Sequence, residues 1–171
     1  MDIVMIALRL IHIFGGFVWF GISFFYVRFL EPTTKVTGPE GQRFVQKMAQ
    51  VTPINSVVGL AGMLTTLSGL IMYGIVSGGF QGAWITSPYG LALTIGGIFG
   101  TAEAVHGALV LGPKAGRIAV LAKEMESAGG PPDPARLAEI QRLQAKLSQG
   151  GVRGVWFLTV ALIGMSIAQY L

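Results

Sequence analysis

Four long stretches of the chain are almost continuously apolar, and polar segments separate them. They cover roughly residues 3–30, 54–77, 89–112 and 154–171. Each is close to the ~20 residues that a helix needs to cross the apolar core of a bilayer. The apolar positions do not alternate as in a membrane strand, and backbone groups in lipid need the internal hydrogen bonds of a helix. The pattern predicts an all-α polytopic membrane protein, an antiparallel bundle of four transmembrane helices, with residues 1–171 as one domain.

The two longer polar segments, 31–53 and 113–153, contain helical patterns of their own. In the first, the turn-rich "EPTTKVTGPEG" precedes "QRFVQKMAQ", which predicts a short interfacial helix. In the second, "KAGRIAVLAKEMESA" continues the third span as an amphipathic helix, "GGPPDP" breaks it, and "ARLAEIQRLQAKLSQ" predicts a second amphipathic helix. These helices either lie on the cytoplasmic surface or form a docking platform for a partner subunit.

The charges are few and lie mostly on one side of the predicted bundle. Only 12% of the residues are charged, against about a quarter in soluble domains. Eleven of the 12 Lys and Arg residues lie at Arg28 or beyond, within the two polar segments and their margins. The positive-inside rule makes these segments cytoplasmic, places both termini outside and indicates the inner (cytoplasmic) membrane. The net charge of +4 therefore reflects membrane topology, and we expect no nucleic-acid partner.

The absence of cysteine narrows the chemistry further. Without it, the chain has no disulfide, no thiolate metal site and no cysteine nucleophile. The motif "EAVH" places one Glu-x-x-His in the third span, but a di-iron bundle would need this motif twice with additional carboxylates. A di-iron centre is therefore excluded.

Ionisable residues inside membrane spans are candidates for function. The first span carries Arg9 and His12 on one face with Trp19, at helical spacing. A histidine in this setting can ligate a metal through one ring nitrogen while a neighbour holds the other. His12 and His106 are therefore candidate haem or metal ligands, with Trp19 beside the cofactor. Arg9 either pairs with an anionic group such as a haem propionate or extends to the interface.

The third span carries Glu103 and His106 one helical turn apart. They form either a proton-handling pair or a second site towards the cytoplasm. At 1.5 Å per residue, His12 and His106 differ by roughly 12 Å in depth, which disfavours one haem bridged by both. Met165 in the fourth span, and Met72 in the second, lie at a level closer to His12. Met165 is therefore a candidate second axial ligand, and an open sixth position is the alternative.

The stretch "LRLIHIFGGFVWFGISFFYVRF" resembles the first helix of HemJ-type membrane proteins, the oxygen-linked protoporphyrinogen oxidases. The likeness rests on a basic residue three before a histidine, a following Trp-Phe pair and a Tyr–Arg end. "RFVQKMAQVTPINSVVGLAGMLTTLSGLIMYG" is similar to the second helix of that group, and the first helix also looks like that of CopD-type copper-resistance domains. The resemblance covers about residues 5–75. It implies a haem b or a metal at His12 and an activity like that of protoporphyrinogen oxidase, although HemJ-type chains carry more histidines than the two present here.

These observations lead to three functional hypotheses. The first is a haem-b-binding membrane protein, an oxidoreductase by hypothesis, that acts in electron transfer or in oxidation of a lipophilic substrate. The second is a CopD-like copper-handling protein with Arg9, His12, Met72 and Met165 at an outward-facing site, since imidazole and thioether ligands suit copper. The third is a non-catalytic subunit of a larger membrane complex. The expected partners are the lipid bilayer, a redox partner or other membrane subunits, and a homo-oligomer stays open.

Overall fold

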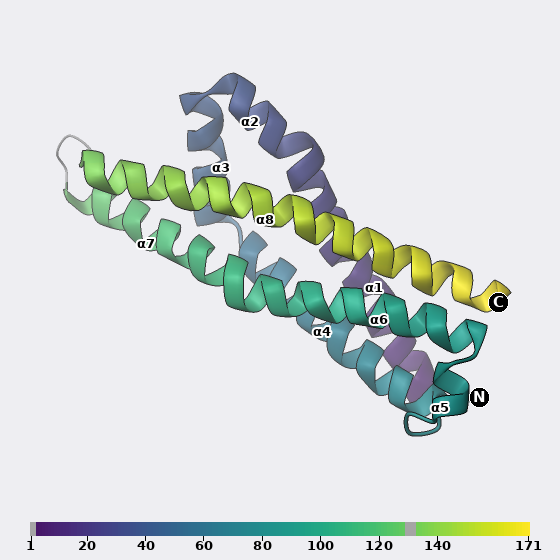
Figure 1. Cartoon of the computed structure of the whole chain (residues 1–171). Coiled ribbons are helices and arrows are strands. Elements are labelled where there is room, and N and C mark those ends of the chain that lie inside the picture. The colour runs from purple at the N-terminus through teal and green to yellow at the C-terminus, as the bar shows by residue number, and fades with distance from the viewer. Residues whose placement is uncertain (1–2, 129–132) are drawn as a thin grey trace.

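The structure, a computed structural model, describes residues 3–128 and 133–171 (Figure 1). Within these ranges all the regular elements are helices. Their bounds are α1 Ile3–Phe25, η1 Tyr26–Leu30, α2 Glu31–Thr37, α3 Pro39–Val51, α4 Ile54–Val76, α5 Gly82–Ile85, α6 Pro88–His106, η2 Gly107–Leu111, α7 Gly112–Ala128, α8 Pro134–Ile167 and η3 Ala168–Tyr170. Here η1 and η2 are single wide π-helical turns inside longer helices, and η3 is a 3₁₀ turn.

Four helical stretches are long and apolar enough to cross a membrane: Ile3–Thr37, Ile54–Val76, Pro88–Ala128 and Pro134–Tyr170. Their large apolar side chains stay largely outside the protein core, as Phe17 shows with an exposed fraction of 76%. Water would penalise such contiguous apolar surfaces, whereas lipid accommodates them. The prediction of an all-helical, multi-pass membrane protein with four spanning helices is confirmed at this level.

The connecting segments are more helical than the sequence pattern predicts. The stretch "EPTTKVTGPEG" forms α2 up to Thr37, and the turn comes only at Gly38, whose φ of +63° suits glycine. The predicted amphipathic helix "ARLAEIQRLQAKLSQ" is the first half of α8 and runs without a break into the fourth span. Gly150 and Gly151 do not interrupt it, because the absence of side chains lets α8 pack closely against its neighbours. Most of the predicted break at "GGPPDP" lies outside the described residues.

The spanning helices form two closely packed pairs, α1 with α4 and α6–α7 with α8 (Figure 1). In the first pair, His12 lies against Gly69 and Trp19 against Gly62, so the two helices run in opposite directions. Trp19 is buried because Gly62 leaves room for the indole, and a Cβ at position 62 would lie only 3.1 Å from the ring. Trp19 therefore acts as a packing residue between the two helices.

The second pair is longer and also antiparallel. Along it, Gly96 meets Met165, Glu103 meets Gly154, and Glu124 forms an ion pair with Arg136 at 3.2 Å; these contacts run from one end of the pair to the other. Figure 1 shows α7 and α8 continuing side by side beyond α6.

Contacts of α4 with α6 and of α1 with α8 join the two pairs. Between α4 and α6, the Tyr73 hydroxyl and Thr94 Oγ1 form a hydrogen bond of 2.5 Å. The Trp84 ring packs edge-on against Tyr73, with centroids 5.3 Å apart. One end of the molecule is therefore held by a small aromatic and hydrogen-bonded cluster.

Candidate functional site

His12 reaches from α1 to the backbone of α4. Its Nδ1 lies 2.8 Å from the carbonyl oxygen of Thr65. Because a carbonyl oxygen only accepts, Nδ1 carries the proton, and Nε2 keeps its lone pair. A backbone carbonyl that holds one nitrogen in this way orients the other nitrogen of a histidine for ligand binding.

Gly69 makes room for the imidazole on α4. A Cβ at position 69 would lie 2.7 Å from Cε1 of His12 and 2.9 Å from Nδ1, so any side chain there would displace the ring. The hydroxyls of Thr65 and Thr66 are buried nearby on the same helix without a hydrogen-bond partner among the described residues. The surroundings of His12 are thus polar at several points within an apolar span. In the sequence, the only sign of these polar surroundings is the spacing of Thr66 and Gly69, which places them on one helix face.

The other residues that the sequence singles out on the first and fourth spans lie apart from this contact. Arg9 is exposed one helical turn before His12. Trp19 is buried over Gly62, and the Met165 side chain packs against Gly96 of α6, where a Cβ would meet Met165 Cγ at 3.1 Å. The contacts of Trp19 and Met165 therefore belong to helix packing.

Glu103 and His106 form a pair within α6. The carboxylate of Glu103 is buried, with 5% of the residue exposed, and its Oε2 lies 2.9 Å from Nδ1 of His106. The i,i+3 spacing in the sequence predicts this contact.

Two glycines of α8 enclose the Glu103–His106 pair. The carboxylate of Glu103 packs directly on Gly154, leaving no space for a Cβ there. A Cβ at Gly150 would lie 3.4 Å from Cε1 of His106. Both glycines lie in the stretch "GGVRG", but the sequence does not tell which side chains they face.

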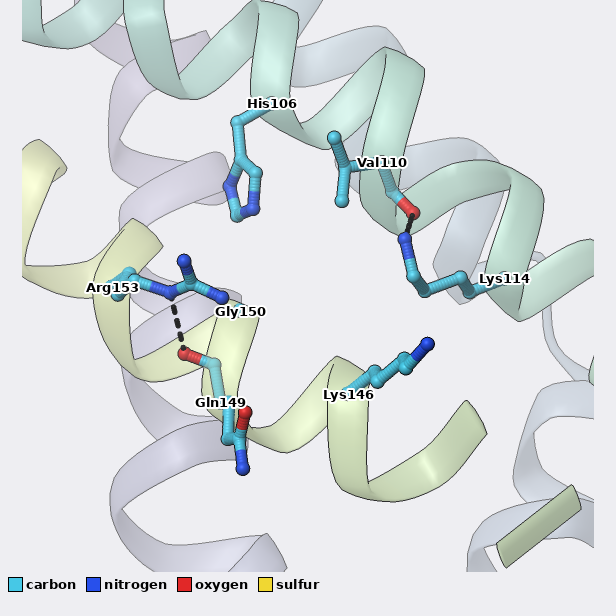
Figure 2. A pocket seen from close by; sticks show the side chains of 7 residues that line it. All are labelled: His106, Val110, Lys114, Lys146, Gln149, Gly150 and Arg153. Atoms are coloured by element: carbon cyan, nitrogen blue, oxygen red, sulfur yellow. Dashed lines mark hydrogen bonds between the residues drawn. The ribbon is translucent and has the colours of Figure 1, made fainter. Parts of the chain in front are cut away.

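His106 also lines a pocket of about 340 Å³, drawn in Figure 2. The pocket lies between the end of α6, η2 and α7 on one side and α8 on the other. Its lining residues are His106, Val110, Lys114, Lys146, Gln149, Gly150 and Arg153. Sequence reasoning treated these basic residues as topology signals and did not place them together.

The two histidines lie apart from other side chains of the kinds that usually ligate metals, except for Glu103 beside His106. Among residues 3–128 and 133–171, no group of three or more His, Cys, Asp or Glu side chains could hold a metal ion. His12 and His106 are held by different partners, Thr65 and Glu103, on different helices. Each histidine therefore presents an isolated imidazole.

Comparison of the chain with protein-family models, with curated proteins and with solved structures found no match. The functional argument consequently starts from the geometry of His12 and of the Glu103–His106 pair.

Proposed function

We propose that this chain is a multi-pass protein of the cytoplasmic membrane that binds haem b through His12. In this proposal it acts in electron transfer or in oxidation of a lipophilic substrate. The observation that supports it is the 2.8 Å contact from Nδ1 of His12 to the Thr65 carbonyl oxygen, because it leaves Nε2 as a lone-pair donor inside an apolar span.

The proposed topology is one antiparallel four-helix bundle, with α7 and the first half of α8 on the cytoplasmic side. The charges support it: the connector between α4 and α6, "SGGFQGAWITSPYG", carries none, whereas α7 and the first half of α8 carry six of the 12 Lys and Arg residues. The positive-inside rule then orients the bundle with α7 inside and both termini outside.

The residues around His12 fit a haem held by one ligand from this chain. The Thr65 carbonyl fixes the tautomer and ring orientation, and Gly69 leaves the space in which the ring stands. Arg9, exposed one turn away, supplies a cation for a propionate. When bound, haem b supplies a one-electron couple, and the burial and hydrogen bonding of its ligand tune the potential.

On the other helix pair, Glu103 and His106 would handle protons. The carboxylate is hydrogen-bonded to Nδ1 of His106, and His106 also lines the pocket between η2, α7 and α8. A proton taken up there by His106 stays next to a carboxylate buried under Gly154. This arrangement gives the cytoplasmic side a proton acceptor that is separate from His12.

The decisive test is the absorption spectrum of the detergent-purified protein, oxidised and then reduced with dithionite. The wild type, His12→Ala and His106→Ala would be compared after haem supplementation. We expect a Soret band in the wild type and in His106→Ala, and its loss in His12→Ala. The HemJ-type resemblance makes protoporphyrinogen the first lipophilic substrate to assay with the coloured protein.

Two outcomes would overturn the proposal. A wild type that stays colourless after supplementation does not bind haem; copper in a metal analysis would then favour a metal-handling protein, and co-purifying chains would favour a non-catalytic subunit. A Soret band of full intensity in His12→Ala would assign the ligand to another residue.

A further inference from the structure

The pocket lined by His106 has walls from two separate parts of the chain. On one wall His106, Val110 and Lys114 follow one another at intervals of four residues, so they share a helix face. On the other wall Lys146 and Arg153 lie two turns apart on α8. Figure 2 shows Lys146 and Arg153 on one side of an open centre and Lys114 on the opposite side. We call this site the basic pocket.

The basic pocket gathers positive charge that acidic side chains do not balance. In the described part of the chain, its lining residues include no acid. The Nζ of Lys114 donates to the Val110 carbonyl oxygen at 2.8 Å, and Nε of Arg153 donates to the Gln149 carbonyl oxygen at 3.4 Å. These contacts hold the side chains in place but leave their charges uncompensated.

Two arginines elsewhere on the same helices have acidic partners. Arg117 forms an ion pair with Glu139 at 3.0 Å, and Arg136 pairs with Glu124 at 3.2 Å. No such ion pair forms at Lys114, Lys146 or Arg153 among the described residues. Like charges brought together in this way favour an anion between them.

The helix that forms one wall of the pocket also departs from regular α-helical geometry there. The wide π-helical turn η2, Gly107–Leu111, joins α6 to α7 beside the pocket. Such turns inside α-helices are frequent at functional sites. On the α8 side Gly150 is buried, and a Cβ there would lie 2.5 Å from Cδ2 of Leu111, so the two walls approach closely below the opening.

The surfaces next to the basic pocket indicate the chemical class of the anion. It lies where the apolar α6 gives way to the charged α7, and η2 exposes Leu109 and Val110 with exposed fractions of 72% and 38%. A ligand with a phosphate and apolar chains matches both surfaces. Basic pockets between membrane helices on the cytoplasmic side bind the headgroups of anionic lipids, and a volume of about 340 Å³ lies within the ~300–1,000 Å³ of small-molecule sites.

We propose that the basic pocket binds the phosphate of an anionic phospholipid headgroup. Arg153 offers two parallel N–H donors to phosphate oxygens, Lys114 and Lys146 contribute point charges from opposite walls, and the Gln149 amide is a further donor. The acyl chains lie along the exposed side chains of η2. This proposal does not depend on haem binding, because His12 lies on the other helix pair.

The experiment measures retained lipid on the full-length protein by native mass spectrometry. The purified protein is delipidated in detergent and titrated with phosphatidylglycerol, with phosphatidylcholine as the zwitterionic comparison. We expect saturable binding of phosphatidylglycerol to the wild type and weaker binding of phosphatidylcholine. Lys146→Gln/Arg153→Gln should lower the apparent affinity by about tenfold or more, since it removes two charge-assisted contacts.

The matched control is Lys123→Gln/Arg142→Gln, which removes the same charge from exposed positions of α7 and α8 outside the basic pocket. It should change the affinity less than twofold. Lys114→Gln, on the opposite wall, is the second variant and should also weaken binding, which keeps the test valid if the double variant fails to fold.

Three results would overturn the proposal. An equal loss in the control variant would assign binding to general surface charge. Equal retention of phosphatidylcholine would show that the anionic headgroup is not selected. Displacement of the lipid by millimolar inorganic phosphate, with phosphate itself retained, would assign the site to a free phosphate compound instead.

Discussion

His12 and His106 are both held through Nδ1, but by partners of different kinds. The partner of His12 is the backbone carbonyl of Thr65, a neutral acceptor on another helix. The partner of His106 is the carboxylate of Glu103, one turn away on its own helix. A carbonyl oxygen only accepts a hydrogen bond, so Nδ1 of His12 donates to it, whereas a carboxylate is a charged partner when it is ionised. Under the proposed function, this difference assigns ligand binding to His12 and proton handling to His106.

The two helix pairs use the same packing device, and in both pairs the glycines lie on the later of the two helices. In the first pair, glycines of the later helix, α4, receive His12 and Trp19 from α1. In the second pair, glycines of the later helix, α8, receive Glu103 and His106 from α6. Substitution of these glycines therefore tests each site without touching the functional side chain itself.

The largest expected effect is that of Gly69→Ala on haem binding. The new Cβ would lie 2.7 Å from Cε1 of His12, so the ring must leave the Thr65 carbonyl. We expect at least a tenfold loss of haem affinity, about 1.4 kcal/mol, measured by titration of the Soret band. The control is Gly59→Ala, on the same helix with open space around the position. Equal affinities in the two variants would separate haem binding from the orientation of His12.

The corresponding change in the second pair is Gly154→Ala, which should act on stability and leave haem binding intact. A Cβ at position 154 would clash with the Glu103 carboxylate, which packs directly on Gly154. Overpacking of this kind costs about 1–3 kcal/mol in unfolding free energy. Gly97→Ala, where α6 has open space, should be neutral or stabilising because alanine is the better helix former. Detergent-denaturation curves would show the difference, and a Gly154→Ala protein as stable as Gly97→Ala would contradict it.

Two substitutions of Glu103 distinguish the contribution of its hydrogen bond to stability from the contribution of its size. Glu103→Ala leaves His106 without its hydrogen-bond partner and should lower the unfolding free energy by about 2 kcal/mol. Glu103→Gln keeps the size and an acceptor oxygen, so it should recover part of this loss. The same denaturation curves test both variants. Identical curves for the two would mean that the hydrogen bond to His106 contributes nothing to stability.

The smallest expected effect concerns the link between the two pairs. Tyr73→Phe removes the 2.5 Å hydrogen bond to Thr94 and should cost about 1 kcal/mol. Tyr170→Phe, at an exposed position near the C-terminus, is the control and should leave stability unchanged. If both variants unfold like the wild type, the α4–α6 contact is held by ring packing alone.

Several features of the candidate sites follow from sequence patterns within one helix. The four spans follow from the length of the apolar runs, and the contact between Glu103 and His106 follows from their i,i+3 spacing. The extent of α8 did not follow, because Gly150 and Gly151 resemble a helix end in the sequence. They are part of the helix because Leu111 and His106 pack against Gly150, and Val27 of η1 packs against Gly151.

What the sequence by itself determined about this protein is therefore local: helical spans, the segments that carry the basic residues, and pairs of residues one turn apart. Tertiary structure alone decided which residues meet across helices. The placement of Gly69 under His12, of Gly154 under Glu103, and of Lys114 opposite Arg153 depends on how two helices align along each other. Helical periodicity specifies the face on which a side chain lies, but the alignment of two helices depends on side-chain packing along their whole length.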